Sequence, residues 1–324
     1  MKRILVLNTG GTIGMKATPK GLVPDSEFLE QYVRQNILPK YPNLYMSWID
    51  LEPLIDSSHI SVDDWNNIGN KIESSVNEFD SFLIIHGTDT LAYTSSYLGL
   101  ALKNLHKTVV VTGSMFSIQE ANSDGPDNLE HSINTCLSDQ YKGVLVCFNN
   151  RLLPGEHVSK VDASAKDAFK APVSDKIYPL PMNGQFERLT VSEQLIEVFT
   201  LFPGCHYQAL EFMAKSSSKA IILRSFGSGN APNSVALQEI IKCAIQNNKL
   251  VINMSQCLAS QVDMHRYAAG EQLRNIGVIS GYTMTLEAII IKLQIILSNI
   301  TDKDKIIEEF IKPWAREMPP IEHH

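Results

Sequence analysis

The chain alternates short apolar runs with amphipathic stretches, and turns rich in Gly, Ser and Asn separate them. Most of the runs are rich in β-branched residues and lack polar alternation, which is typical of strands buried on both faces of a parallel sheet. The runs are Ile4–Leu7, Phe82–Ile85, Val109–Val111, Val144–Phe148, Ala220–Leu223 and Leu250–Asn253. This pattern predicts parallel strands covered by helices.

Helical periodicity fills the spaces between these runs. From Asp63 to Phe79 apolar residues recur every three or four positions, and Ser61 and Asp64 give the stretch a start that resembles a capping box. The stretch Asn233–Asn248 repeats the design. Alternating strands and helices predict an α/β fold with a doubly wound, mostly parallel sheet.

The alternation of apolar runs and amphipathic stretches stops between Lys170 and Gly204. Several prolines occur there, and the apolar residues follow little regular spacing. A change of this kind is typical of a crossing between domains. We therefore predict a larger N-terminal domain over residues 1–190, a linker over 191–212 and a smaller C-terminal α/β domain over 213–324.

Charge and hydropathy narrow the classes of partner. The 28 Lys and Arg stand against 35 Asp and Glu, for a net charge of −7, and no basic run offers a surface for nucleic acid. The longest apolar stretch, Leu286–Leu297, is interrupted by charged residues and falls short of the about 20 residues that span a membrane. Ile4–Leu7 is too short for the core of a signal peptide, so we expect a cytoplasmic protein.

The cysteines and histidines indicate neither a disulfide framework nor a metal site. The five cysteines are widely spaced and form no C-x-x-C pair, and the nine histidines show no metal-ligand spacing. We interpret the cysteines as small, largely buried apolar residues. They are Cys136, Cys147, Cys205, Cys243 and Cys257.

The first candidate site follows the first apolar run. The sequence N-T-G-G-T-I-G at Asn8–Gly14 has glycines that let the backbone approach a ligand and carries Thr12 in the turn. Its spacing fits neither the dinucleotide fingerprint nor the phosphate-binding P-loop. A tight strand-to-helix turn with Thr12 as a helix cap is an equal alternative.

The second candidate site follows the second apolar run. At His86–Thr90 the sequence H-G-T-D-T places a hydroxyl, Thr88, and a carboxylate, Asp89, at a strand end beside a helix N-terminus. Alternatively, Thr88 or Asp89 simply caps that helix. Asp56–Ser58 and Thr112–Ser114 add two polar turns, which alone are ordinary turn chemistry.

Two threonines on Gly-rich strand ends suggest a nucleophile. A Thr hydroxyl is a poor nucleophile at neutral pH and needs a neighbouring base or cation. An amine suits this role where burial and its neighbours lower its pKa. The composition does not identify the lysine.

Taken together, Thr9–Gly14 and His86–Thr90 resemble the paired signatures of bacterial-type L-asparaginases, and G-G-T-I-G-M resembles the cytoplasmic type I branch. The resemblance covers nearly the whole chain. Further matches follow in order at Asp56–Ser58, Thr112–Ser114, Ser123–Gly125, Phe148–Arg151, Leu223–Pro232 and Ser255–Cys257.

The resemblance implies a mechanism. Thr12 would attack the side-chain amide carbon of L-asparagine, form an acyl-enzyme and release ammonia, and water would then release L-aspartate. Thr88, Asp89 and Lys160 would form a second hydroxyl–acid–amine set, Lys160 because it lies in the loop after F-N-N-R. Otherwise Lys160 would be interpreted as a solvated loop residue. The backbone at Thr88 would help to hold the developing oxyanion.

The resemblance also implies a substrate pocket. Ser57 and Asp89 would bind the α-carboxylate and α-amino groups of the substrate. The remaining pocket residues would be Gly11, Asp56, Ser58, Gly87 and Ser114. This chemistry needs no metal and no organic cofactor.

One departure concerns a Tyr that many members carry in a mobile loop after the first signature. Met15–Asp25 contains no Tyr, and the matching position is Leu22. The composition of this loop, with Pro and Gly after a Gly-rich turn, is that of a lid. We regard Tyr282 as a candidate replacement for the missing phenol. A packing role for Tyr282 is an equal alternative.

Assembly and regulation rest on the resemblance alone. Family members form tetramers built from closer dimers, which implies a homo-oligomer. Some members of the type I branch are activated by asparagine, and the matching positions here include Ser159, Arg224 and Cys257. Ser159 replaces a Thr, which leaves regulation open.

Two other functions compete with the asparaginase hypothesis. One is an asparaginase-like amidotransferase subunit that supplies ammonia to a tRNA-charging reaction, although such a subunit normally carries extra domains. The other is a non-catalytic amino-acid-binding protein, which the missing lid Tyr favours. The joint presence of Thr12, Thr88, Asp89 and Lys160 argues against it, because a binding protein does not need two hydroxyls and an amine together.

Overall fold

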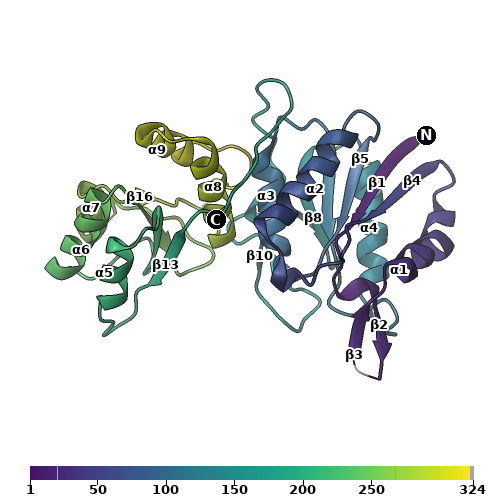
Figure 1. The fold of residues 1–324 in the computed structure, drawn as a ribbon, viewed down its shortest axis with the longest axis horizontal. Helices are drawn as coiled ribbons and strands as arrows, with labels where there is room; N and C mark the ends of the chain where they lie inside the picture. The colour runs from purple at the N-terminus through teal and green to yellow at the C-terminus, as the bar shows by residue number, and fades with distance from the viewer. Residues whose placement is uncertain (20, 267, 322–324) are drawn as a thin grey trace. The chain divides into compact units, whose positions relative to one another are not determined.

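The computed structural model describes residues 1–19, 21–266 and 268–321. The chain forms two compact units. The first comprises Met1–Ala171 with Asp175–Leu189, and the second comprises Pro172–Ser174 with Thr190–His324. Each unit contains a sheet with helices on its faces (Figure 1), so the predicted two-part α/β architecture is confirmed.

The sheet of the first unit has six strands, and its strand order reverses between the second and third positions. In spatial order the strands are β4 (Leu44–Asp50), β1 (Lys2–Asn8), β5 (Ser81–Ile85), β7 (Thr108–Thr112), β8 (Gly143–Phe148) and β9 (Arg151–Pro154). All neighbours are parallel except β8 and β9. Because β4 and β5 flank β1 on opposite sides, the crevice beyond the carboxyl ends of β1 and β5 is where such folds bind ligands.

Helices cover both faces of this sheet because alternate strand residues point to opposite faces. The helices are α1 (Ser26–Tyr32), α2 (Val62–Ser75), α3 (Leu91–Ala101) and α4 (Gly125–Leu137). Apolar residues of α1 and α4 pack with strand residues such as Ile4 and Val110 in one cluster, and α2 and α3 lie on the other side (Figure 1). The predicted capping box of Ser61 and Asp64 starts α2.

Among its described residues, the first unit also contains three two-stranded ribbons. They pair β2 (Met15–Thr18) with β3 (Gly21–Pro24), β10 (Ser159–Lys160) with β11 (Phe169–Lys170), and β6 (Leu102–Lys103) with β12 (Glu187–Arg188). In the segment predicted as a lid, the described residues form the antiparallel pair β2 and β3 directly after the first Gly-rich turn, and residue 20 lies outside the described part. The hydroxyl of Ser117 donates to the carbonyl of Met15 at 2.6 Å, which ties the base of the hairpin to the loop after β7.

The F-N-N-R motif forms the turn that reverses the chain between β8 and β9. Asn149 and Asn150 have φ angles of 47° and 57°. Asn tolerates this left-handed region, and two such residues in a row suit the twist of a two-residue β-hairpin. The turn sends the chain back along β8, toward the short strand that ends in Lys160.

The sheet of the second unit has four parallel strands in chain order, without a reversal. They are β13 (Ile196–Thr200), β14 (Ala220–Ser225), β15 (Leu250–Ser255) and β16 (Ile279–Ser280). Its helices are α5 (Gln208–Lys215), α6 (Val235–Gln246), α7 (Ala268–Asn275), α8 (Leu286–Asn299) and α9 (Lys303–Ile311). Residues of α5, α6 and α7 pack on one face, and residues of α8 and α9 pack on the other.

The segment 191–212, predicted as a linker, instead contains β13 and the start of α5. β13 pairs in parallel with β14 over five residues and belongs to the second unit. It escapes the sequence pattern because it is an edge strand whose side chains are mostly half-exposed or exposed. Such a strand carries no continuous apolar run.

Within residues 1–19, 21–266 and 268–321, no helix is long and apolar enough to cross a membrane. The same residues contain no group of three or more His, Cys, Asp or Glu that could hold a metal ion.

Candidate active site

The turns after β1 and β5 touch in the crevice at the point where the strand order reverses. Gly11 has a φ of 100°, and a Cβ there would lie 2.6 Å from the nitrogen of Gly87. A Cβ on Gly87 would in turn lie 2.5 Å from the Oγ of Ser57. Real Cβ atoms essentially never come this close, so only glycine fits at both positions. Three turns that are far apart in sequence therefore meet here.

The turn after β7 packs against the same place. A Cβ on Gly113 would lie 2.2 Å from the carbonyl oxygen of His86. Ser114, the predicted pocket residue, is buried, and its hydroxyl donates to the carbonyl of Phe116 at 2.5 Å. The carboxyl ends of three adjacent strands thus supply the walls of one site.

Lys160 connects two of the predicted residues. Its Nζ donates to Thr88 Oγ1 and to Asp89 Oδ1, both at 2.8 Å. The lysine side chain is 18% exposed, whereas that of Asp89 is 63% exposed. The amine is therefore held between a hydroxyl and a carboxylate at the rim of the crevice, which differs from the solvated-loop interpretation.

The helix-cap interpretations of the two motifs do not describe the structure. Thr12 begins a single 3₁₀ turn, Thr12–Gly14, whose N-cap residue is Gly11. The N-cap residue of α3 is Thr90, not Thr88 or Asp89, and it makes no side-chain capping bond. Thr12, Thr88 and Asp89 are therefore not used to cap a helix.

The D-S-S motif forms a turn beside Gly87. Asp56 accepts a hydrogen bond from the backbone N–H of Ser58 at 3.0 Å. This bond, with a second from the Ser58 hydroxyl, holds the pKa of Asp56 below its ordinary value. Ser57 is buried against Gly87, whereas Asp56 and Ser58 are exposed.

The remaining predicted residues are divided between the two units. Ser159 is buried in β10 of the first unit, next to Lys160. Arg224 and Cys257 lie in the second unit at the carboxyl ends of β14 and β15, where the side chain of Gln256 donates to the carbonyl of Arg224. The regulatory role of these residues stays a prediction.

Tyr282 also lies in the second unit, two residues after the end of β16. It has a φ of 51°, and its side chain is 37% exposed. An aromatic residue rarely adopts this left-handed backbone conformation, and such outliers cluster at functional sites. The hypothesis that Tyr282 replaces the lid phenol stays a prediction.

Two residues that have no predicted role hold the turns in place. Asp124 is buried, and its carboxylate accepts hydrogen bonds from the backbone N–H groups of Met115 and Phe116 at 3.0 and 3.2 Å. Thr90 donates its hydroxyl to the carbonyl of Ser57 at 2.7 Å. Both residues lie inside quoted motifs, S-D-G and H-G-T-D-T, which were the available signal.

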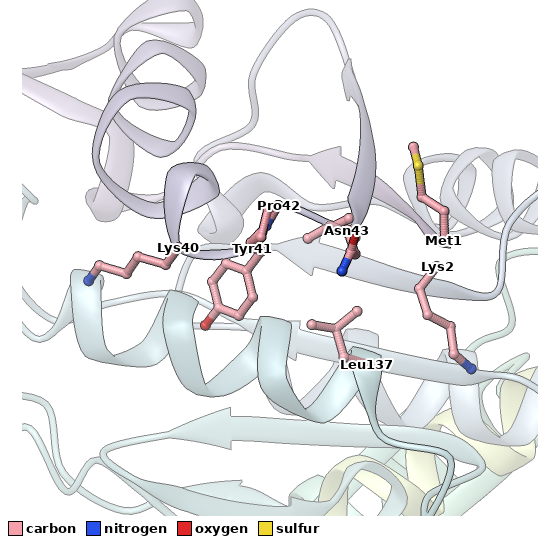
Figure 2. Close-up of a pocket in the computed structure, with 8 residues that line it drawn as sticks. Met1, Lys2, Lys40, Tyr41, Pro42, Asn43 and Leu137 are labelled. Atoms are coloured by element: carbon pink, nitrogen blue, oxygen red, sulfur yellow. The ribbon is translucent and has the colours of Figure 1, made fainter.

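A pocket lies at the opposite end of the same sheet, beside the amino ends of β1 and β4 (Figure 2). Its volume is about 420 Å³. The pocket is lined by Met1, Lys2, Lys40, Tyr41, Pro42, Asn43, Leu44 and Leu137. The amino groups of Lys2 and Lys40 point away from one another in this view, and each pairs with a carboxylate, of Asp139 and Glu130 respectively.

Fold and site together define a two-unit α/β protein with a hydroxyl–amine–carboxylate set at a strand crevice, an arrangement suited to nucleophilic hydrolysis. Residues 3–189 match the family described as "Asparaginase, N-terminal", and residues 195–310 match the "Glutaminase/Asparaginase C-terminal domain". The chain belongs to the asparaginase family of amidohydrolases.

Individual relatives match over the whole length. The chain is 34% identical to "L-asparaginase 1" of Escherichia coli K12, over 98% of each chain. It resembles the crystal structure of L-asparaginase I from Vibrio cholerae with a TM-score of 0.87 and 33% identity, over 98% of this chain and 99% of that one. It also resembles the thermostable L-asparaginase of Thermococcus kodakarensis, with a TM-score of 0.90 and 29% identity over 98% and 99% of the two chains.

Proposed function

We propose that this protein hydrolyses the side-chain amide of L-asparagine to L-aspartate and ammonia, and that the first unit carries the catalytic residues. The observation that carries the proposal is the position of Lys160, 2.8 Å from both the Thr88 hydroxyl and the Asp89 carboxylate. An amine held in this way can relay protons to and from a hydroxyl at a crevice built to receive a small ligand. Membership of the asparaginase family supports the choice of amide chemistry.

The reaction takes place in two steps. In the first, Thr12 Oγ1 bonds to the amide carbon of the substrate, the C–N bond breaks, and the nitrogen leaves as ammonia with the proton that the hydroxyl loses. In the second, the oxygen of water bonds to the carbon of the resulting ester, the bond between that carbon and Oγ1 breaks, a proton of the water passes to Oγ1, and aspartate leaves. Thr88, Lys160 and Asp89 move the protons, and the N–H of Thr88 stabilises the oxyanion in both steps.

Recognition of the amino acid falls to the turn residues around the crevice. Ser57 and Asp89 bind the α-carboxylate and the α-amino group, and the exposed carboxylate of Asp89 supplies the negative charge that an ammonium group needs. The other residues of the pocket are Gly11, Asp56, Ser58, Gly87 and Ser114. Glutamine is a poorer substrate, but one extra methylene is worth only about 1–3 kcal/mol of discrimination.

The test is ammonia release from asparagine and glutamine, measured side by side for the wild type and for Thr12→Ala. Thr200→Ala is a matched control, because Thr200 is exposed on β13 of the second unit. We expect fast release from asparagine that disappears in Thr12→Ala and persists in Thr200→Ala. A folded wild type that binds aspartate but releases no ammonia would instead indicate the amino-acid-binding protein. Release that appears only with a partner subunit would indicate the amidotransferase.

The phenol of Tyr282 takes the place of the missing lid Tyr at Leu22. Its left-handed backbone at a strand end supports this assignment. Tyr282→Phe keeps the aromatic ring and removes the hydroxyl, so we expect a loss of kcat with an unchanged melting temperature. Wild-type kinetics in Tyr282→Phe would make Tyr282 a packing residue.

Assembly, regulation and location follow the family. The protein forms a homo-oligomer, is regulated through Ser159, Arg224 and Cys257, and acts in the cytoplasm. The resemblance of the sequence motifs to the type I branch supports these proposals. Light scattering gives the mass in solution, and a sigmoidal dependence of rate on asparagine that Arg224→Ala abolishes reveals the regulation.

A further inference from the structure

His86 is a buried histidine behind the turn of Gly87 and Thr88, and the mechanism above gives it no role. It follows β5 directly, and its backbone N–H donates to the carbonyl of Thr112 at 2.8 Å, which continues the pairing with β7. Its side chain is 1% exposed. Burial lowers the pKa of His86 to about 4, so the imidazole is neutral at neutral pH and carries one N–H.

The hydrogen-bond partners of this imidazole fix the position of that single proton. His86 Nδ1 lies 2.7 Å from the carbonyl oxygen of Gly87, which can only accept, so Nδ1 carries the hydrogen. Nε2 then accepts a hydrogen bond from the hydroxyl of Thr94 at 2.9 Å. The indole N–H of Trp65, which can only donate, reaches the same hydroxyl oxygen at 3.0 Å. The series of hydrogen bonds from Trp65 through Thr94 and His86 to Gly87 therefore has one direction. The donor at one end and the acceptor at the other both require that direction.

This series of hydrogen bonds ends on the peptide group whose N–H stabilises the oxyanion in the proposed reaction. The carbonyl of Gly87 and the N–H of Thr88 belong to one planar peptide unit, so holding the oxygen also sets the direction of the N–H. Glycine has the freest backbone of any residue, and Gly87 can carry no Cβ because it packs against Ser57. The Gly87–Thr88 peptide therefore needs a restraint from elsewhere.

We propose that His86 is a positioning residue, whose Nδ1–H holds the Gly87 carbonyl and so aims the Thr88 N–H at the oxyanion. Thr94 and Trp65 act behind it by fixing the tautomer and the ring plane. The proposal rests on the proposed function, in which the Thr88 N–H stabilises the oxyanion. The proposal adds three residues that set the direction of the oxyanion donor: Trp65 of α2, Thr94 of α3 and His86 at the end of β5. Their side chains act without contacting the substrate.

The kinetic test compares two substitutions of similar size. His86→Leu removes the donor, whereas His86→Asn places an amide N–H near the position of Nδ1. A misdirected oxyanion donor acts in the transition state, so we expect kcat of His86→Leu to fall between about 10- and 100-fold with KM within about twofold. His86→Asn should recover most of the loss. His106, exposed in the loop before β7, provides a matched histidine-to-leucine control that keeps wild-type kinetics.

Two kinetic outcomes would overturn the proposal. One is wild-type kcat in His86→Leu. The other is an equal loss in His86→Leu and His86→Asn that follows the drop in melting temperature, since this would show a structural role only. A wild type that releases no ammonia from asparagine overturns the proposed function, and it is recognised without any His86 variant.

A spectroscopic test reads the network without substrate. In protein labelled with ¹⁵N-histidine, the imidazole signal that disappears in His86→Asn should show the Nδ1–H tautomer at pH 7. Thr94→Val removes the donor to Nε2 and should shift that signal toward a mixture of tautomers. An Nε2–H tautomer in the wild type would overturn the proposal, whatever the kinetics.

Discussion

Lysine side chains pair with carboxylates at both ends of the sheet of the first unit, but the two ends are built differently. At the amino end, Lys2 and Lys40 pair on the surface with Asp139 and Glu130 (Figure 2), and exposed pairs of this kind hold their partners only weakly. At the carboxyl end, Lys160 is mostly buried and bonds to Thr88 and Asp89.

The difference shows which features distinguish a candidate active site from an ordinary surface pocket. At the carboxyl end the turns touch at distances that exclude a Cβ, and the peptide of Gly87 is held by hydrogen bonds that reach back into the core. The donors and acceptors there keep their direction before any ligand arrives, which is the condition for electrostatic catalysis. The presence of a pocket alone is therefore no guide to function.

The largest expected effect comes from replacing the lysine at the carboxyl end. Lys160→Met keeps the length of the stem and removes the amine from between Thr88 and Asp89. We expect kcat for ammonia release to fall by about 1,000-fold or more, as when one member of a catalytic set is lost. A fall of less than tenfold in a folded protein would contradict the proton-transfer role.

The second-largest effect is expected when a methyl group is added where the turns of Gly87 and Ser57 touch. In Gly87→Ala the new Cβ meets the Ser57 side chain at 2.5 Å and must push that turn away. We expect kcat/KM to fall by about 100-fold, because misplacement by about 1 Å costs this much in a preorganised site. Weaker binding of aspartate, measured by calorimetry, should accompany the loss. Unchanged binding would show that the turns need not touch.

Acid should weaken the core behind the site through His86. The folded pKa is about 4 and the unfolded value is 6.5, so below pH 6.5 the unfolded chain binds a proton that the folded chain refuses. Stability is therefore lost as the pH falls from 6.5 to 4, and the loss reaches about 3 kcal/mol. His86→Asn lacks this contribution, and urea unfolding of both proteins at pH 7 and pH 4 measures it. Parallel losses in the two proteins would contradict the buried neutral histidine.

The smallest effect is expected at the amino end. Lys2→Met breaks the exposed pair with Asp139 in the pocket of Figure 2. We expect kcat and KM for asparagine to stay within about twofold of the wild type, because solvent already screens this pair. It is also the matched lysine-to-methionine control for Lys160→Met. A loss similar to that of Lys160→Met would remove the distinction between the two ends.

Much of the fold could be predicted because its central strands are buried on both faces. Each of the six apolar runs lies in a strand of one of the two sheets. β4 and β13 were missed because they lie at sheet edges, where half-exposed strands carry mixed residues such as those of Leu44–Asp50. Continuous apolar runs mark only strands that are buried on both faces, so they do not predict strands that are partly exposed.

For the candidate site, the sequence located the turns but not the connections between them. Strand-end motifs could be expected to converge, because parallel strands end at one edge of a sheet. Lys160 was assigned only by resemblance, since its position depends on the hairpin at Asn149 and Asn150. The hydrogen bonds that connect Trp65, Thr94 and His86 join three separate elements, so no local pattern in the sequence predicts them.

A crystal structure of the protein with L-aspartate, the product of the proposed reaction, tests the central claim most directly. We expect aspartate in the crevice between the turns of Gly11 and Gly87, with its α-carboxylate at Ser57 and its side-chain carboxylate facing Thr12 and the N–H of Thr88. Aspartate in the pocket of Figure 2, with the crevice empty, would contradict the account.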